Sequence, residues 1–470
     1  MDWSQLLCSQ RPRGKRTGAS FGTSDLRTEF EKDYHRIIGS ASFRRLQDKT
    51  QVFPLDKSDF IRTRLTHSLE VSSFGKSLGQ SVSQRILQEK RDKSFLPDYK
   101  AHVCDILQCA GLLHDIGNPP FGHFGETAIR QWFKENLPRL EFDGTPVSQL
   151  LNQQMQEDFY HFEGNTQALR LVTKLHFLVD EHGMNLTKAL LGTIIKYPVS
   201  SLEIDKDSGD IKDKKLGYYY GDRELFHDIQ DSLGTKGLRH PLTFLLEAAD
   251  DIAYKTADLE DACKKGCLTY EELVRELRQR GEGRGKGYQE ITDHLEQRYQ
   301  QAKERRLSDP KLNAIQNWLV FVQGKMIEAA TSGFMDHYDS IMAGTHKTDL
   351  FVGTDAEAVM EALGSIAFDY AFNIKPILKL ELAAQTIFDF LLDRFVDAAL
   401  YFDTEKARSE SQKKLIALVS DNYKGVYHIS AKGKDQIEKL YLRLLLVTDF
   451  ICGMTDSYAK TLYQELNGIL

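Results

Sequence analysis

The sequence predicts an all-α protein from the spacing of its apolar residues, and two further observations indicate a packed core and no membrane span. Apolar residues recur mainly three and four positions apart, the spacing of an amphipathic helix, whereas alternating strand-like runs are few and short. Hydrophobic residues make up 41% of the 470 residues, which is enough for a packed core. No run approaches the roughly 18 consecutive apolar residues of a membrane-spanning helix, so we expect no membrane association.

Helices and loops can be placed along the chain from the same periodicity. Two stretches rich in glycine and charge, residues 203–224 and 278–290, are expected to be loops or insertions. Because helical patterns run on both sides of each stretch, we expect one helical domain with appended helices. The clearest helices are expected at residues 64–87, 101–115, 241–262, 383–402 and 436–454.

The composition narrows the class of protein. A net charge of -7 argues against a surface that coats nucleic acid, although it leaves room for local basic grooves. Six cysteines include no Cys-x-x-Cys pair, and the sequence CKKGC at residues 263–267 has the wrong spacing for structural zinc. The first residues contain no apolar stretch long enough for a signal peptide. We therefore expect free thiols and a cytoplasmic protein.

The segment GLLHDIGNPPFGHFGE, residues 111–126, places two histidines and two carboxylates at one turn. His114 lies eleven residues after Val103, three helical turns on, so it continues a buried stripe. Gly117 suits a helix cap, and the two prolines that follow prevent continuation of the helix. At a helix end, His114 and the adjacent Asp115 can both contact one ion.

A second His-Asp pair, His227–Asp228, serves as an internal comparison. It follows the polar stretch 203–224 and has no comparable apolar run before it. We expect this pair to be solvated. Helical phase therefore distinguishes two pairs that are identical as dipeptides.

Two further ligand-type residues face inward. His67 begins a stripe with Val71 at the fourth position, and Asp250 follows an apolar leucine by four residues. The neighbouring Asp251 is expected at the surface or beside the ligands. A buried carboxylate needs a cation or hydrogen-bond partners, and two imidazoles with two carboxylates suit Mn²⁺, Mg²⁺, Co²⁺ or Fe²⁺. The predicted ligands are His67, His114, Asp115 and Asp250.

This H…HD…D pattern resembles the HD-domain phosphohydrolases. The chain as a whole resembles the bacterial deoxyguanosine triphosphate triphosphohydrolases, which convert a deoxynucleoside triphosphate (dNTP) and water to a deoxynucleoside and tripolyphosphate. The resemblance implies an N-terminal arm (1–25), an HD-domain core (26–275) and a C-terminal helical region (276–470) that completes the pocket and makes oligomer contacts. The segments that carry it are 34–55, 62–71, 114–126, 162–170, 194–198, 239–262 and 368–373.

The resemblance also implies roles for individual residues. His123 would be the general acid or base at the α-phosphorus, oriented by Glu126, which lies three positions later on the same predicted helical turn. The other implied roles are phosphate contacts by Arg64, Lys196 and Tyr197, contacts to the 3′-hydroxyl by Gln51 and Asp258, exclusion of a 2′-hydroxyl by Val52 and Tyr254, and pocket positions at Asn165, Phe372 and Glu381.

Several alternatives stay open at this point. Another HD phosphohydrolase could act on nucleoside monophosphates, cyclic nucleotides or alarmones, and an inactive relative could be a nucleotide sensor or single-strand-binding scaffold. The family implies homo-oligomers, hexamers or tetramers, and some members bind nucleotides or nucleic acid as effectors. The basic clusters 11–16 and 303–306 could serve an effector, although a charge run is usually a solvated face. Among the dNTPs, the resemblance favours dGTP as the substrate.

Overall fold

The computed structural model describes residues 1–13, 25–55, 58, 60–176 and 180–469. Its described residues form α-helices α1 to α22, and their only sheet is a hairpin of two-residue strands, β1 (Glu141–Phe142) and β2 (Thr145–Pro146). The predicted all-α class is therefore confirmed. Within these described residues, no helix is long and apolar enough to cross a membrane.

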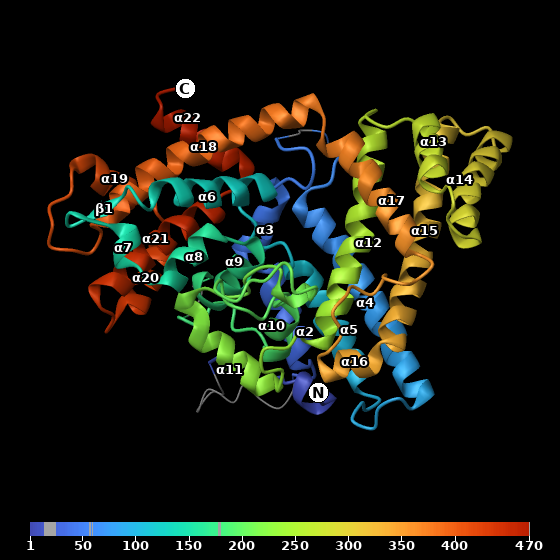
Figure 1. Ribbon diagram of the computed structural model, residues 1–470, viewed down its shortest axis with the longest axis horizontal. Helices are drawn as coiled ribbons and strands as arrows, with labels where there is room; N and C mark the ends of the chain where they lie inside the picture. Colours follow the sequence, from blue (N-terminus) through green and yellow to red (C-terminus); the bar gives the residue numbers. More distant parts are fainter. Residues whose placement is uncertain (14–24, 56–57, 59, 177–179, 470) are drawn as a thin grey trace.

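Three long helices form the centre of the molecule: α4 (Arg64–Glu89), α5 (Tyr99–Leu113) and α12 (Pro241–Lys264). Thr63 and the side chain of Thr66 cap the start of α4 reciprocally, which fixes where this helix begins. Helices α4 and α5 pack side by side along much of their length, and α12 packs against both. In Figure 1, α12 runs through the middle of the molecule, with α13 to α15 on one side and α6 and α18 on the other.

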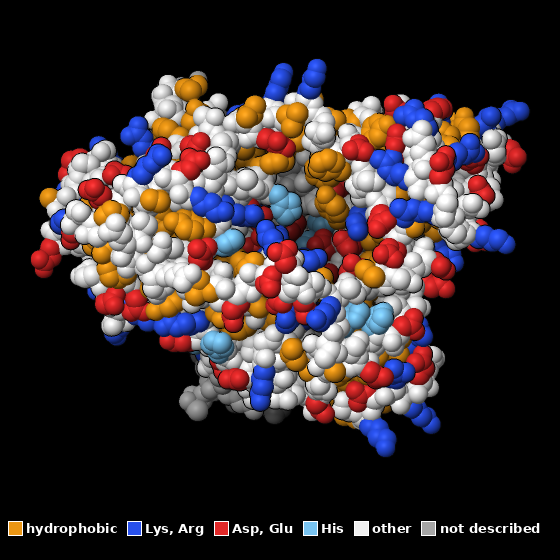
Figure 2. Space-filling model, viewed as in Figure 1, with side chains coloured by type: hydrophobic (Ala, Val, Ile, Leu, Met, Phe, Trp, Pro, Cys, Tyr) orange, Lys and Arg blue, Asp and Glu red, His pale blue; other side chains and the backbone are white. Residues whose placement is uncertain are grey.

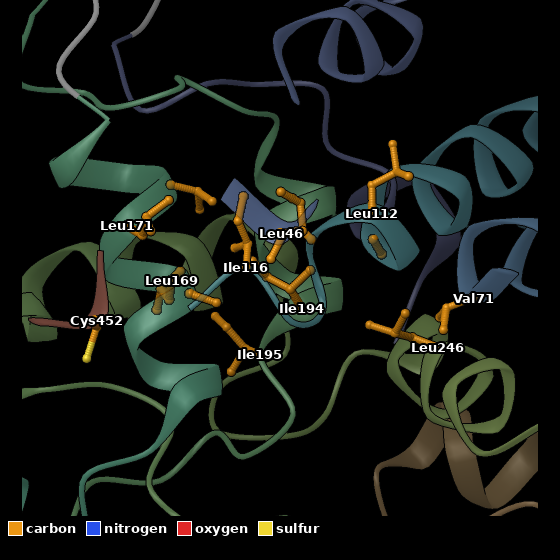
Figure 3. Close-up of a cluster of buried hydrophobic side chains, with 14 of the residues drawn as sticks. Leu46, Val71, Leu112, Ile116, Leu169, Leu171, Ile194, Ile195, Leu246 and Cys452 are labelled. Carbon is orange, nitrogen blue, oxygen red and sulfur yellow. The ribbon is translucent and has the colours of Figure 1, made fainter. Parts of the chain in front are cut away.

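Apolar residues one turn or less from the predicted ligands pack where these three helices meet. Val71 on α4, Leu112 on α5 and Leu246 on α12 are fully buried. Figure 3 shows these three side chains within one buried cluster. Because rigid apolar packing holds each helix at these positions, the faces that carry the ligands are oriented toward one another.

The remaining elements surround this centre. The N-terminal part forms α1 (Trp3–Leu6), α2 (Glu29–Ile38), α3 (Ala41–Arg45) and the 3-10 helix η1 (Leu46–Asp48). Between the second and third central helices lie α6 (His123–Asn136), α7 (Val147–Leu150), α8 (Gln153–Tyr160), α9 (Gly164–Arg170), the π-helix η2 (Leu171–Leu175), α10 (Lys188–Ile194), the 3-10 helices η3 (Ile211–Asp213) and η4 (Tyr220–Asp222), and α11 (Arg223–Leu233).

The C-terminal half is helical throughout and covers two sides of the centre. Helix α15 packs on α4 and α12, whereas α18 packs on α6 and α21. Its elements are α13 (Tyr270–Arg280), α14 (Lys286–Glu304), α15 (Pro310–Asp336), α16 (Tyr338–Ala343), α17 (Glu357–Ala367), the π-helix η5 (Phe368–Phe372), α18 (Lys375–Leu400), α19 (Glu410–Leu418), α20 (Asp421–Ala431), α21 (Gln436–Cys452) and α22 (Asp456–Leu466).

The prediction of a loop at 278–290 is wrong in its extent. Helix α13 continues to Arg280 and α14 begins at Lys286, so only residues 281–285 are non-helical. Charged residues in this stretch pair on the helices, as Arg280 does with Glu276. A run of charge that pairs four residues apart supports a solvated helix as well as a loop, and the sequence pattern did not separate the two.

The polar stretch 203–224 is mostly irregular, as expected, but its second half is not a surface loop. Leu216 and Tyr219 are fully buried, and the amide of Gly217 donates a hydrogen bond to the carbonyl of Val199. The hydroxyl of Thr166 donates to the carbonyl of Leu216. This segment is therefore packed against α9, next to the predicted site.

The N-terminal residues are docked on the protein. Trp3 is buried, and its indole N–H donates a hydrogen bond of 2.7 Å to the hydroxyl of Tyr338. Arg11, from the predicted basic cluster, is paired with Asp33 at 2.6 Å, and Arg13 is paired with Asp180. Residues 14–16 of that cluster lie outside the described residues. The two described arginines are therefore occupied by internal partners.

Candidate active site

The four predicted metal ligands meet between α4, α12 and the C-terminal end of α5. His67 Nε2 lies 3.3 Å from Asp250 Oδ1, and His114 Nε2 lies 3.4 Å from the same oxygen. His114 Nε2 is also 3.5 Å from Asp115 Oδ2. One ligand atom each from His67, His114 and Asp115 lie within 4.8 Å of one another. Nitrogen and oxygen atoms from three separate helical segments thus converge on one point.

This donor set fits a divalent metal ion. His114 Nδ1 must donate its proton to the carbonyl of Gly111, 2.8 Å away, because a carbonyl only accepts. Nε2 then carries a lone pair, yet it is buried without a hydrogen-bond partner among the described residues. Burial lowers the pKa of His114, which favours the neutral imidazole that a metal requires. An orphaned imidazole nitrogen facing two carboxylates is a site for a cation.

Two cations and one amide hold the carboxylates in place. Arg64 Nη1 is 2.5 Å from Asp115 Oδ2, and the side-chain amide of Asn118 donates to Asp115 Oδ1 at 2.7 Å. Lys196 Nζ lies 3.2 Å from Asp250 Oδ2. Arg64 is buried, which the sequence did not indicate because its position alone is typical of a surface charge.

The charges of this cluster shift the pKa values of both carboxylates downward. Burial by itself would raise the pKa of Asp115, but the Arg64 guanidinium together with His114 and His67 outweighs it and holds the pKa low. For Asp250, burial is outweighed by the attraction of His114, Lys196 and His67. Both carboxylates are therefore ionised at neutral pH, as ligands of a hard divalent ion must be.

His123 and Glu126 form a pair at the start of α6. His123 Nδ1 donates to Glu126 Oε2 at 3.0 Å, and the side chain of His123 is 76% exposed whereas that of Glu126 is 2% exposed. The hydrogen bond to Glu126 raises the pKa of His123. Burial would raise the pKa of Glu126, but the bond from His123 and nearby cations lower it to about 2. When the imidazole is protonated, the pair therefore presents Nε2–H toward open space.

Glu126 is itself held by residues that the sequence reasoning missed. The amide of Gly164 donates to Glu126 Oε1 at 2.8 Å, and Arg130 Nη2 lies 3.0 Å from Oε2. Beside it, Glu163 accepts from Lys215 at 2.8 Å and from Asn165 at 3.0 Å. Lys215 comes from the polar stretch 203–224, so no local pattern could have linked it to this site.

Asp250, Tyr254 and Asp258 lie at successive turns of α12, as their spacing predicts. Asp258 is fully buried, and neither of its carboxylate oxygens has a hydrogen-bond partner in the described part of the chain. Burial and the carboxylate of Asp261 raise its pKa. The Tyr254 ring lies 6.1 Å from the ring of Phe372 and nearly parallel to it, at 27°.

The other predicted pocket residues lie on several segments. Val52 is buried, and the side-chain oxygen of Gln51 is buried without a partner among the described residues. Tyr197 is half-buried beside Lys196. Glu381, on α18, is also half-buried, and within the described residues it makes no hydrogen bond or ion pair. Among the described residues, neither Gln51 nor Glu381 forms a hydrogen bond or ion pair with the ligand cluster, so their part in a pocket stays a prediction.

The comparison pair behaves differently. His227 and Asp228 are exposed on α11, and Asp228 forms an ion pair with Lys188 at 2.8 Å. In Figure 2 the face in view is hollowed near its centre, and histidine, acidic and basic side chains gather inside the hollow.

Two glycines near His114, Gly117 and Gly122, lie where a Cβ would collide with neighbouring atoms. The suggestion that Gly117 caps the helix is wrong, because α5 ends at Leu113 with His114 at its C-cap. A Cβ at Gly117 would lie 2.1 Å from the backbone nitrogen of Ala168. Gly122 has a φ of +57°, and a Cβ there would lie 2.3 Å from Arg64 Nη2. Only glycine lets the turn before His123 pass this close to the buried arginine.

A helical protein with a histidine on one helix, a His-Asp pair at the end of the next and an aspartate on a third has the architecture of an HD-domain protein. The HD domain family profile matches residues 64–180, which include three of the four clustered ligands.

Three relatives define the family more narrowly. A deoxyguanosinetriphosphate triphosphohydrolase-like protein of Listeria innocua is 48% identical, with both chains covered completely. One of the same description from Pseudomonas aeruginosa is 36% identical over 100% of this chain and 99% of its own. The deoxyguanosinetriphosphate triphosphohydrolase of Yersinia enterocolitica is 31% identical over 99% of each chain. The chain belongs to this family, and it is a phosphohydrolase.

Proposed function

We propose that this protein is a metal-dependent dNTP triphosphohydrolase that acts on dGTP and attacks the α-phosphorus. The observation that carries the proposal is the buried His114 Nε2, orphaned between two ionised carboxylates, together with the exposed His123 beside it in sequence. The names of the relatives support the substrate class. A divalent metal ion at His67, His114, Asp115 and Asp250 would supply Lewis acidity and an acidified water.

The acid–base pair suits departure of the 5′-oxygen of the sugar. An alkoxide is a poor leaving group, so a proton donor must lie close to it. His123 carries that proton on Nε2, and the buried Glu126 keeps the imidazolium form populated to higher pH. Attack on the outer phosphates would normally use a Gly-rich loop of the G-x-x-x-x-G-K-[ST] type, and the sequence contains none.

Binding of the triphosphate is assigned to Arg64, Lys196 and Tyr197. The two cations balance Asp115 and Asp250 in this structure, at 2.5 and 3.2 Å, so they are already positioned at the cluster. Charge-assisted contacts from an arginine and a lysine suit phosphate oxygens.

Binding of the sugar and the base is assigned to the pocket residues. Within the described part of the chain, Gln51 and Asp258 bring buried oxygens without hydrogen-bond partners, and a deoxyribose 3′-hydroxyl would donate to one of them. Tyr254 and Val52 would exclude a 2′-hydroxyl by size, with Phe372, Asn165 and Glu381 around the base. Residues 26–275 are assigned as the catalytic core, with 1–25 as an arm. Residues 276–470 would complete the pocket and the contacts of a cytoplasmic homo-oligomer.

The test is hydrolysis in ¹⁸O-labelled water with Mn²⁺ or Mg²⁺, using each of the four dNTPs and four NTPs. We expect deoxynucleoside and intact tripolyphosphate as products, with the label only in tripolyphosphate and the fastest turnover on dGTP. Label in the nucleoside, or dNMP with pyrophosphate among the early products, would contradict attack at the α-phosphorus. A His123→Ala variant that keeps its metal and turns over very slowly serves as the control.

A further inference from the structure

The carboxylate of Asp456, the first residue of α22, joins two distant parts of the active site. Asp456 is 1% exposed. Its Oδ2 accepts hydrogen bonds from the backbone amide of Thr50 at 3.0 Å and from the Thr50 hydroxyl at 2.5 Å. Its Oδ1 accepts from the backbone amide of Phe121 at 2.8 Å. One buried side chain thus satisfies three donors from two segments that lie about seventy residues apart.

Both of these segments carry residues of the proposed function. Thr50 immediately precedes Gln51 and Val52, and it forms an isolated antiparallel bridge with Thr63, next to Arg64. Phe121 lies two residues before His123, in the loop that connects the metal ligands to the acid–base pair.

The conformation of Phe121 needs support. Its φ is +60°, a region that a bulky residue with a Cβ enters only when its surroundings hold it there. The hydrogen bond from its amide to Asp456 and the packing of its ring near Phe388 are the contacts that do so. Loss of the carboxylate removes the polar half of this support and leaves a buried amide without a partner.

Lys49 makes a second connection beside the first. Its buried ammonium donates to the carbonyl of Asn118 at 2.6 Å and to the carbonyl of Cys452 at 2.7 Å. Asn118 in turn donates to the metal-site carboxylate of Asp115. The turn between α21 and α22, residues 452–456, is therefore tied at both of its ends to the loop 118–121.

We propose that Asp456 and Lys49 are positioning residues, and that the α21–α22 turn sets the placement of His123 through Phe121 and of Gln51 through Thr50. This inference rests on the proposed roles of His123 and Gln51. It makes the last helix of the chain part of the catalytic apparatus. Neither residue contacts the ligand cluster, so both act only through the segments they hold.

The experiment compares Asp456→Asn with Asp421→Asn. Asp421 is also the first residue of a helix, α20, but its exposed carboxylate only pairs with Lys424 on the surface. Both changes remove a negative charge from a helix N-terminus, so a general effect on helix stability would appear in both. The asparagine at 456 keeps one acceptor oxygen and presents an amide to the donors of the second segment.

For Asp456→Asn we expect kcat per metal-loaded site to fall about 10- to 100-fold, because misplacement of a reacting group by about 1 Å has effects of this size. We expect KM for the dNTP to rise as well, with metal affinity unchanged. Asp421→Asn should leave all three unchanged. A loss of activity explained entirely by a smaller folded fraction, with normal kcat per metal-loaded site, would overturn the proposal.

A second measurement does not depend on the substrate. Hydrogen exchange of the metal-loaded protein should increase in Asp456→Asn at residues 117–123 and at 49–53 together, and at neither in Asp421→Asn. Lys49→Met should increase exchange at 117–123. Unchanged exchange at these segments would refute the inference even if the ¹⁸O experiment succeeds, whereas increased exchange with different reaction products would reject only the proposed function.

Discussion

Asp115 and Asp250 divide their oxygens between the metal-type site and its surroundings. Asp250 turns one oxygen to the two histidines and the other to Lys196. Asp115 turns Oδ2 to His114 and Arg64, and Oδ1 to Asn118. Each carboxylate is therefore oriented by a partner before any ion binds. At His227–Asp228 the described residues form no such arrangement, because Asp228 is exposed and pairs only with the ammonium of Lys188.

Replacement of a proposed ligand should therefore affect hydrolysis and metal binding much more than replacement of His227. We expect Asp250→Ala to abolish hydrolysis and to lower the bound metal, because it removes the oxygen nearest both imidazoles. His227→Ala should change neither. Metal content of the purified variants and their turnover of dGTP are the measurements. A metal-replete, active Asp250→Ala enzyme would contradict the ligand assignment.

The His123–Glu126 pair predicts a dependence on pH. Because Glu126 raises the pKa of His123, the protonated acid persists to higher pH than for an ordinary histidine. In Glu126→Gln the pKa of His123 should fall, so the alkaline limb of the activity profile should move to lower pH. The measurement is kcat against pH for both enzymes at saturating metal. An alkaline limb that does not move would show that another group is titrating there.

At the scale of elements, close approach of α4 and α5 brings His67 and His114 together. A Cβ on Gly111 would lie 2.5 Å from the backbone of Ser72, so only a glycine allows this contact. Gly111 also offers the carbonyl that fixes the tautomer of His114. The rings of His67 and His114 are 5.1 Å apart as a result. The packing of two helices and the chemistry of a ligand thus depend on one residue.

Gly111→Ala should lower the free energy of unfolding by about 1–3 kcal/mol, because overpacking forces the helices apart. It should also weaken metal binding, since His114 moves with the carbonyl. Gly324→Ala is the matched control: Gly324 lies in the middle of α15 with nothing near a new Cβ. There, alanine should stabilise the helix by about 0.5–1 kcal/mol. Denaturant unfolding and metal titration of both variants are the measurements. Equal effects of the two changes would exclude the close contact as the cause.

At the scale of the whole molecule, segments from near the N-terminus to near the C-terminus contribute to the site. The segment 49–52, the central helices, the loop 114–126, the segment 163–165 and the turn 452–456 all contribute side chains or their supports. The helices that carry the proposed metal ligands also form part of the buried core, with Val71, Leu112 and Leu246 within a turn of these residues. The framework of the site is therefore built by apolar packing.

Removal of metal should consequently leave the fold intact. We expect the helical content measured by circular dichroism to be unchanged by a chelator, and Mn²⁺ to raise Tm. An ion that binds only the native state stabilises it by about 2.7 kcal/mol at a concentration 100 times its Kd. His114→Ala should lose most of this increase in Tm. A chelated protein without helical signal would contradict a preformed site.

The sequence pattern by itself determined where the long helices lie and which ligand-type residues face inward. Helical periodicity predicted the long helices, and helical phase distinguished His114 from His227 and selected Asp250 over Asp251, whose side chain is 39% exposed and pairs with Lys255. The three-residue spacing of His123 and Glu126 predicted their contact. These features depend on residues within a few turns of one another, and the helix repeat alone relates such residues in space.

Only the tertiary structure decided the rest. It buried Arg64 against Asp115, brought Lys215 to Glu163, and placed Asp456 between Thr50 and Phe121. It also showed that much of 278–290 is helical and that Gly117 makes a close contact. Each of these results depends on which distant segments pack together. The packing of whole helices in the core determines those contacts, and the spacing of residues along the sequence does not predict it.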